Sequence, residues 1–335
     1  NGILAGTVNP STIRIEHSEF GHNGFGDGFT HNLYINNVDS LIFRYNYSHH
    51  AIVGHELKSR ARVNVIEYNR FSNENEGIAS REIDLPNGGQ AYLIGNVIQQ
   101  GPQGENSNLV GFGMEGLNNP GPHELYAVNN TLVNEKTVGN FFQMPEAVYF
   151  KAFNNIIAGG GSMMSAWPTS IDTLANLRRT DITACGFNAP NSYDYRIDDG
   201  SPAHNLGIPA GVATNGYPLV ALFEYVHPAN GVERCQHALL DAGAFETCTT
   251  GIPNRKSVIM NLCPNPVMEQ LSIHLPSDVT LGDVEILDAE GRLICRRPSS
   301  VCLRSTFDVS GLRPGFFTVR AHTSRGLFTG SFVKQ

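Results

Sequence analysis

Charged residues are scarce in this chain of 335 residues, since Asp, Glu, Lys and Arg together make up only 16%. The net charge is −8 and no block of Lys or Arg occurs, so the composition argues against a nucleic-acid partner. It also argues against a helical bundle or a disordered chain. The 35 glycines instead favour a β-rich protein with many turns.

Long apolar runs are also missing. No segment approaches the ~18 consecutive apolar residues that a membrane-spanning helix needs, so no transmembrane segment is expected. No signal peptide is visible, and the chain begins at Asn1 rather than at Met. We interpret the chain as a mature or truncated form of an exported protein.

Cysteine is absent from residues 1–184, and the six cysteines beyond that point contain no Cys-x-x-Cys pair. A zinc or redox motif is therefore not supported. An even number in an exported protein permits disulfides, and Cys295 and Cys302 are spaced to close a hairpin. Free buried thiols are the alternative, and the sequence leaves the pairing open.

The first half of the chain contains a repeated phrase: a few apolar or aromatic residues, then Asn, then another apolar pair. Its copies follow one another at intervals of 23, 27, 34 and 25 residues, and internal repeats of this length indicate a stacked architecture. Because each copy resembles a short strand and Gly-rich turns lie between copies, residues 1 to about 165 are predicted to form a parallel β-solenoid. The repeated residues are Asn46, Asn69, Asn96, Asn130 and Asn155.

These asparagines are interpreted as scaffold. A bend between strands needs left-handed backbone, which Asn tolerates, and stacked Asn amides can hydrogen-bond from coil to coil.

Beyond the repeats, residues 170–182 have helical spacing and predict a short helix. Residues 249–256 resemble a linker, and the strand pattern with the Glu290-Gly291 turn predicts a small immunoglobulin-like β-sandwich over residues 257–335. The solenoid and its closing segment then span residues 1–248.

A second line of strands lies between the Asn-bearing ones, and we align it as residues 31–35, 55–59, 81–85 and 112–116. Alternation directs one residue of each strand inward and its neighbours outward. The residues expected to point inward are Leu33, Leu57, Ile83 and Met114. The outward positions form two lines, Asn32, Glu56, Glu82 and Gly113 in one, and Tyr34, Lys58, Asp84 and Glu115 in the other.

Charged groups at this spacing repel one another unless a cation or a substrate lies among them. Paired carboxylates can hold Ca²⁺, which prefers several oxygen ligands, or act as acid and base on a glycosidic bond. Lys58 lies between carboxylates that would keep it positively charged, which suits it to stabilise charge better than to abstract a proton. The alternative is a ladder of surface salt bridges.

Histidine is concentrated at the start of the chain, with half of the 12 residues before residue 56. His31, His55 and Arg81 are expected to stack beside the carboxylates, where His55 can be a general base. A transition-metal site lacks support, because no His-x-His or His-x-x-x-His spacing occurs. Tyr34 can stack on a sugar ring. The six early histidines are His17, His22, His31, His49, His50 and His55.

The segment Ser201-Pro202-Ala203 to Gly207 and the later run Asp241 to Glu246 (DAGAFE) resemble the end of many secreted proteins of the pectate-lyase-like superfamily. This resemblance implies a right-handed parallel β-helix whose end these residues cap.

The C-terminal residues resemble the sorting domain of the type IX secretion system. The matching features are Pro264-Asn265-Pro266, the turn from Asp288 to Arg292, the strand entry at Leu312–Phe316 and the terminal FVKQ. The resemblance implies export across the outer membrane of a Bacteroidetes-like bacterium by the type IX machinery, with secretion or attachment to the outer cell surface.

Residues 55–98 resemble polysaccharide lyase family 6. Lys58-Ser59 matches the Lys-Ser pair that supplies the Brønsted base of that family, and Glu56 and Glu82 match its Ca²⁺ site. The family's Leu-Arg-His-Gly strand is replaced here by Asp84 and the residues that follow it, so the second catalytic Arg is missing. Arg81 is the nearest substitute.

The sequence thus predicts a secreted carbohydrate-active β-helix protein that cleaves a polysaccharide. The catalytic candidates are Lys58, His55, Arg81 and Asp84, and the candidates for substrate contact are His31, Tyr34 and Glu115. Glu56 and Glu82 are the candidate Ca²⁺ ligands. The alternative is a non-catalytic surface solenoid that binds glycans or serves as an adhesin, with possible end-to-end stacking of copies into a homo-oligomer.

Overall fold

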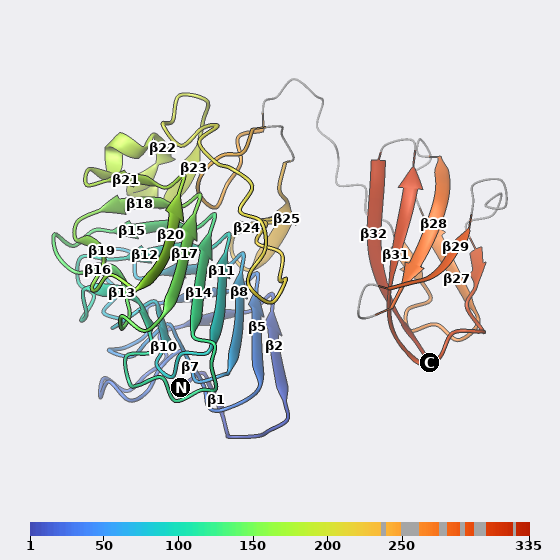
Figure 1. Cartoon of the computed structure of the whole chain (residues 1–335), viewed down its shortest axis with the longest axis horizontal. Helices are drawn as coiled ribbons and strands as arrows, with labels where there is room; N and C mark the ends of the chain where they lie inside the picture. Colours follow the sequence, from blue (N-terminus) through green and yellow to red (C-terminus); the bar gives the residue numbers. More distant parts are fainter. Residues whose placement is uncertain (236–238, 249–260, 275–279, 289–291, 298–305, 324–325) are drawn as a thin grey trace. The chain divides into compact units, whose positions relative to one another are not determined.

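The structure is a computed structural model, and it describes residues 1–235, 239–248, 261–274, 280–288, 292–297, 306–323 and 326–335. The chain divides into two compact units, Asn1–Cys248 and Thr249–Gln335. Nearly all regular elements in the described ranges are strands, which confirms the all-β prediction (Figure 1). No helix in the described ranges has the length and apolar character to cross a membrane.

The N-terminal unit is a parallel β-helix built from three sheets of seven strands, here named A, B and C. Each coil adds one strand to each sheet, and every strand pairs in parallel with its equivalent in the next coil. Sheet A contains β1 (Ile3–Ala5), β4 (Leu33–Ile35), β7 (Leu57–Ser59), β10 (Ile83–Leu85), β13 (Asn108–Phe112), β16 (Asn140–Gln143) and β19 (Ser162–Met164). Sheet B contains β2 (Thr12–Glu16), β5 (Ser40–Arg44), β8 (Val63–Glu67), β11 (Gln90–Ile94), β14 (Glu124–Val128), β17 (Tyr149–Phe153) and β20 (Ser170–Leu174). Sheet C contains β3 (Glu19–Gly21), β6 (Tyr47–His49), β9 (Arg70–Ser72), β12 (Val97–Gln100), β15 (Thr131–Asn134), β18 (Ile156–Gly159) and β21 (Leu177–Arg179).

The asparagine phrase forms the bend between sheets B and C. The Nδ2 of Asn69 donates to the Oδ1 of Asn96 at 3.0 Å, and Asn96 repeats the contact with Asn130 at 3.0 Å. The ladder is therefore real, but the left-handed residue of each bend is the one before the Asn, such as Tyr68 with φ 57°. A sixth member, Asn176, continues the ladder and accepts from Asn155 at 2.9 Å.

The prediction of a helix over residues 170–182 is wrong. Residues Ser170–Leu174 and Leu177–Arg179 are strands β20 and β21 of a further coil, and a short 3₁₀ helix, η1 (Ile182–Cys185), follows them. Pairing of β20 with β17 supplies the hydrogen bonds that an isolated helix would have to make internally. The solenoid is one coil longer than the sequence indicated.

The register of β13, the fifth strand of sheet A, also corrects the sequence alignment. Ile83 pairs with Val110 and Asp84 with Gly111, so Val110 and not Met114 continues the inward line. Met114 is 41% exposed. The inward positions Leu33, Leu57 and Ile83 are confirmed, because all three are fully buried in the core.

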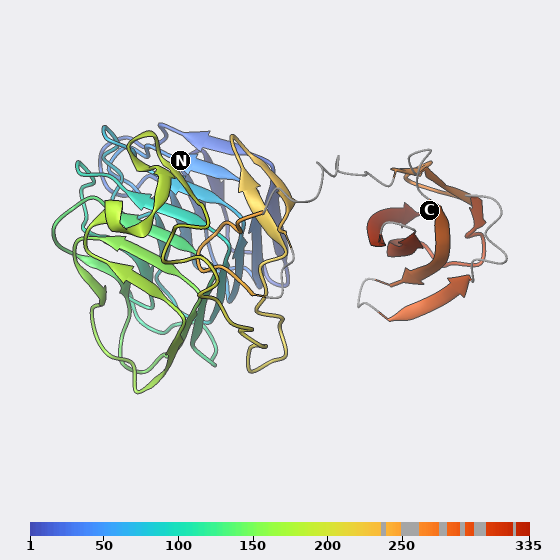
Figure 2. The ribbon, with the colours of Figure 1, turned by 90° about the horizontal axis from the view of Figure 1, so that it is seen from above.

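Residues beyond β21 return over the outside of the solenoid, which Figures 1 and 2 show in yellow and orange beside the sheets. Ala210, Leu219 and Ala221 pack on the outward residues of sheet B, among them Tyr92 and Tyr126. Another part covers sheet C, where the cluster includes Val133, Ala158, Phe187, Tyr195 and Ala244. The elements of this closing segment are β22 (Phe187–Ala189), η2 (Pro190–Ser192), β23 (Asp194–Ile197), β24 (Phe223–Val226) and β25 (Asn230–Glu233).

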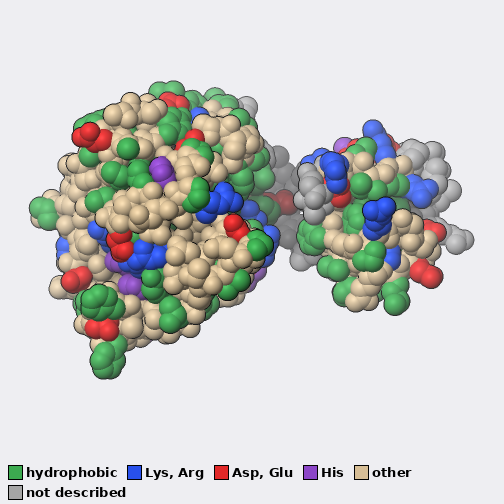
Figure 3. All heavy atoms as spheres, turned by 60° about the horizontal axis from the view of Figure 1, so that its bottom comes forward, with side chains coloured by type: hydrophobic (Ala, Val, Ile, Leu, Met, Phe, Trp, Pro, Cys, Tyr) green, Lys and Arg blue, Asp and Glu red, His purple; other side chains and the backbone are tan. Residues whose placement is uncertain are grey.

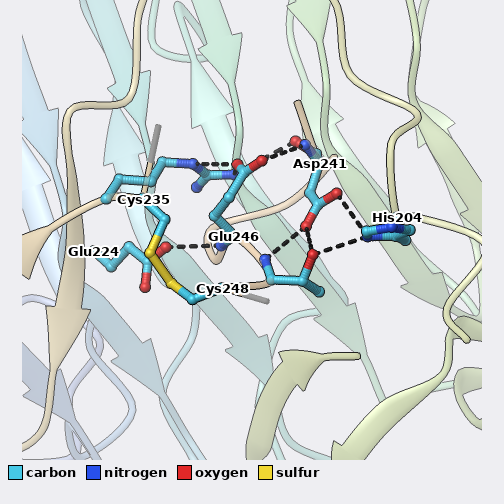
Figure 4. Close-up of a disulfide and its surroundings, with 8 residues drawn as sticks. His204, Glu224, Cys235, Asp241, Glu246 and Cys248 are labelled. Carbon is cyan, nitrogen blue, oxygen red and sulfur yellow. Dashed lines mark hydrogen bonds and ion pairs between the residues drawn. A yellow bond between two sulfur atoms is a disulfide. The ribbon is translucent and has the colours of Figure 1, made fainter. Parts of the chain in front are cut away.

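The closing segment is held by a buried polar cluster beside the disulfide Cys235–Cys248 (Figure 4). Glu246 accepts from the Nε of Arg234 at 2.8 Å and from the backbone N–H of Asp241 at 3.0 Å. The carboxylates of the DAGAFE run therefore have structural partners. This run is not a strand, and it covers the flank of the solenoid, because the N–H of Ala244 donates to Thr131 in β15.

In its described residues, the C-terminal unit has seven strands in two antiparallel sheets. Leu271, Val284, Phe307, Val319 and Phe332 are among the residues of their shared core. One sheet holds β26 (Asn261–Cys263), β27 (Gln270–His274) and β30 (Thr306–Asp308), and the other holds β28 (Leu281–Leu287), β29 (Leu293–Arg297), β31 (Gly315–Thr323) and β32 (Gly326–Lys334). Cys295 is a free thiol, while its suggested partner Cys302, the linker 249–256 and the turn Glu290-Gly291 lie outside the described residues.

Candidate functional site

The outer face of sheet A carries the charged residues that the sequence singled out. Tyr34, Lys58 and Asp84 occupy equivalent positions on β4, β7 and β10, as predicted. The closing segment packs on the outer faces of sheets B and C. The outer face of sheet A is therefore the surface on which a binding site is expected. On the side of the solenoid turned forward in Figure 3, basic, acidic and histidine side chains gather among mostly uncharged groups.

Lys58 lies between two carboxylates. Its Nζ is 3.2 Å from the Oδ2 of Asp84 and 2.6 Å from the Oε1 of Glu115. Glu115 follows the bend after β13 and reaches back over the sheet, so it joins the site although it does not occupy the register position expected from the sequence. Partial burial would raise the pKa of Glu115, but hydrogen bonds from Lys58 and Arg60 prevail and lower it to about 2.

Arg60 is a site residue that the sequence analysis missed. Its guanidinium donates to the hydroxyl of Tyr34 at 2.9 Å and to Asn87 at 2.7 Å, and it pairs with Glu115. Lys58 and Arg60 therefore hold one carboxylate between them. The run Lys58-Ser59-Arg60 was the available signal, because alternation places its two cations on the same side of the chain.

Arg81 reaches the site from a position two residues before β10. Its Nη1 is 3.4 Å from the Oδ1 of Asp84, and its Nη2 donates to Gln143 in β16 at 2.6 Å. The guanidinium crosses β13 where the chain has glycine, since a Cβ on Gly111 would lie 1.9 Å from the Nη1 of Arg81. In the line of Tyr34, Lys58 and Asp84, the next position is thus Gly111, and the side chain of Arg81 fills the space above it.

His31 and His55 form a stacked pair with ring centroids 4.8 Å apart. Burial and nearby positive charge lower the pKa of each ring to about 3, so both are neutral at pH 7. The Nδ1 of His55 accepts the backbone N–H of Arg81 at 3.2 Å, which leaves the proton on Nε2, 3.5 Å from the Oδ2 of Asp84. His55 thus lacks a free lone pair for a general base and instead orients Asp84.

Asn32, Glu56 and Glu82 are fully buried, so the outward line that the sequence predicted for these three residues and Gly113 is wrong. Glu56 accepts from Asn32, from Ser48 at 3.1 Å and from the N–H of Ala51 at 2.9 Å. Burial raises the pKa of Glu56 to about 8, and burial together with Glu56 raises the pKa of Glu82.

These surroundings do not fit the predicted Ca²⁺ site. The partners of Glu56 are hydrogen-bond donors, whereas Ca²⁺ needs six to eight oxygen ligands. Glu82 has one oxygen bonded to Asn73 at 2.9 Å and one without a partner in the structure. In the described part of the chain, no third acidic, His or Cys side chain joins the pair within ligand distance.

The resulting site contains three cations and two carboxylates on the outer face of sheet A, where Lys58 and Asp84 are buried. Lys58 and Arg60 contact Glu115, while Lys58 and Arg81 contact Asp84. Asp84 is almost fully buried, but the side chain of Glu115 is 45% exposed. Glu115 is therefore the partner that an acidic ligand could replace at the lowest cost, because its carboxylate is already partly hydrated.

The comparison with protein families concerns the second unit. Residues 261–335 match a family model described as a secretion system C-terminal sorting domain. This unit is a type IX sorting domain. Its presence makes the chain a secreted or cell-surface protein that the secretion machinery handles. No curated protein and no solved structure matches the chain.

Proposed function

We propose that this secreted solenoid binds an acidic polysaccharide along the outer face of sheet A. The observation that carries the proposal is the clamp made by Lys58 and Arg60 around the half-exposed carboxylate of Glu115. A uronate carboxylate presents the same group, and Arg is suited to bind it with paired hydrogen bonds. Tyr34 beside the clamp offers a ring for a sugar, and Arg81 extends the positive charge along the strands.

Binding to a panel of polyuronates and neutral glucans tests the proposal. Arg60→Ala is expected to weaken binding of polyuronates at least about 10-fold, because charge-assisted hydrogen bonds contribute about 1.5–3 kcal/mol each. Arg62→Ala is the matched control, since Arg62 is an exposed cation two residues away that lies outside the clamp. Equal binding of polyuronate by the two variants, or equal affinity for neutral glucans, would contradict the proposal.

Cleavage of the bound chain by β-elimination is a second candidate function. The observation that favours it is the presence of a primary amine and a guanidinium on one carboxylate, which are the base and the charge neutraliser that β-elimination needs. Lys58, after giving up its own proton to water, would take the proton next to the carboxylate, Arg60 and Arg81 would hold the carboxylate, and Asp84, oriented by His55, would position Lys58.

An ultraviolet assay for the unsaturated product separates the two candidates. A lyase produces this absorbance and loses it in Lys58→Ala, while a binding protein gives none with any glycan that it binds. The same assay with and without added Ca²⁺ tests the ion predicted from the sequence.

A further inference from the structure

We propose that His22, His49 and His50 form a transition-metal site on the first coils of sheet C, separate from the glycan site on sheet A. Nitrogen atoms of the three rings all lie within 4.8 Å of one another. The Nδ1 atoms of His49 and His50 face each other at 2.9 Å. The ring of His22 has its centroid 5.0 Å from that of His50 and 5.3 Å from that of His49.

The stacking of coils creates this group from residues far apart in the sequence. Gly21 in β3 pairs with His49 in β6, so His22 and His50 follow at equivalent positions of neighbouring coils. Both have left-handed backbone, with φ of 57° and 52°. Because the two residues share this backbone conformation at equivalent positions of neighbouring coils, their side chains lie on the same side of the bend, next to His49.

Gly21 makes room for the ring of His49. A Cβ at this position would lie 2.4 Å from the Cε1 of His49 and 2.5 Å from its Nε2. Any side chain there would push the imidazole away from its two neighbours. The ring also stacks on Tyr47 with centroids 4.2 Å apart, which restricts its orientation.

A carboxylate supports the ring from behind. The Nε2 of His49 is 3.2 Å from the Oε1 of Glu19, while its Nδ1 is turned towards His50. Metal-binding histidines commonly donate their second ring N–H to a carboxylate, which fixes the tautomer that leaves the other nitrogen free for the ion. Glu19 occupies this position without itself belonging to the group of three.

The chemistry of the group suits Zn²⁺, Cu²⁺ or Ni²⁺, for which imidazole is a preferred ligand. Three protein nitrogens leave a fourth position open, and the exposed ring of His22 gives that position access to water. The site does not depend on the proposed glycan function, because none of its residues contacts Lys58, Arg60 or Asp84 in the pairs described above.

Calorimetric titration of the full chain with Zn²⁺ tests the site, after chelator treatment and alkylation of the free thiols. One ion per chain with a micromolar or tighter dissociation constant is expected. His49→Ala and His50→Ala should each weaken binding at least about 10-fold, and Glu19→Gln should weaken it by about 10-fold through loss of the second-ring hydrogen bond. Far-ultraviolet circular dichroism checks that the variants remain folded.

His17→Ala is the control, because His17 stacks on Tyr45 and is not one of the three ligands. It should bind Zn²⁺ as the unaltered chain does. His22→Ala and Glu19→Gln alter exposed side chains. A loss of Zn²⁺ binding in these variants therefore does not come from disrupted packing of the core. Absence of a single strong site, or unchanged binding in His22→Ala and His49→Ala, would overturn the proposal.

Discussion

Gly111 shows how one residue without a side chain can shape the site. The guanidinium of Arg81 passes over it to reach Gln143, in space that a Cβ would occupy. Sequence inspection placed a charged residue at this point of the outward line and so missed the gap. The carboxylate that does enter the site, Glu115, comes from the bend that follows β13.

Gly111→Ala is expected to displace Arg81 and weaken polyuronate binding at least 3-fold, with little loss of stability. The clashing atoms are the ends of the side chains of Arg81 and Asp84 and not backbone atoms, so the strand itself does not have to move. Binding and thermal melting of the variant measure the two effects. Gly311→Ala is the control, because a Cβ on Gly311 meets no atom. A variant that binds normally would show that Arg81 does not contribute.

The buried pair Glu56 and Glu82 predicts an unusual pH dependence of stability. The pKa of Glu56 is about 8 in the folded protein against an ordinary 4.5, so between these values the folded state binds the extra proton. Stability should therefore fall as the pH rises through this window. His31 and His55 act in the opposite direction, but between their folded pKa of about 3 and the ordinary 6.5.

Denaturant unfolding between pH 6.5 and 8 isolates the carboxyl effect. The unaltered chain should lose stability across this range, and Glu56→Gln with Glu82→Gln should lose less, because glutamine cannot ionise. Glu146→Gln is the matched control, since Glu146 is exposed. An identical slope for the double variant and the unaltered chain would show that the pair is already ionised at pH 6.5.

At the scale of elements, the asparagine ladder joins the coils at the bend between sheets B and C. Each amide accepts from the coil before it and donates to the coil after it and to a strand carbonyl, so its polar atoms are satisfied inside the protein. The sequence repeat was sufficient to predict this ladder. It did not reveal which residue takes the left-handed conformation, because in a bend the strain falls on the neighbour that precedes the Asn.

Asn96→Ala is expected to lower the free energy of unfolding of the solenoid by about 2–4 kcal/mol. The substitution leaves the amide of Asn69 and the carbonyl of Ile66 buried without their partners, and each unsatisfied buried group costs about 1–3 kcal/mol. Chemical denaturation measures the change. Asn188→Ala, at an exposed position, should cost less than about 0.5 kcal/mol. Equal losses for the two variants would refute the role of the ladder.

At the scale of the whole molecule, the two units have separate cores. The clusters of the solenoid contain residues up to Phe245, and that of the sorting domain begins at Leu262. Separate cores favour independent folding. This separation agrees with the role of the C-terminal unit, which is to direct export of whatever precedes it.

Residues 1–248 produced alone are therefore expected to fold and to melt within about 3 °C of the corresponding transition in the full chain. Scanning calorimetry of both proteins makes the comparison, and polyuronate binding should be unchanged. Aggregation or a broad transition of the shorter protein would show that the solenoid needs the second unit. Light scattering of the same samples tests the end-to-end association predicted from the sequence, which requires species larger than one chain.

Sequence alone determined the parallel solenoid, its Asn ladder, the C-terminal sorting domain and the line Tyr34, Lys58 and Asp84. These features repeat or depend on local spacing, and a periodic pattern can be followed along the chain without knowledge of its folding. Only the tertiary structure decided that Arg60 completes the site, that Glu115 enters it from the bend after β13, that Glu56 and Glu82 are buried, and that His22 meets His49 and His50. Those outcomes depend on bends of unequal length and on which face the closing segment covers, and a linear pattern does not record either.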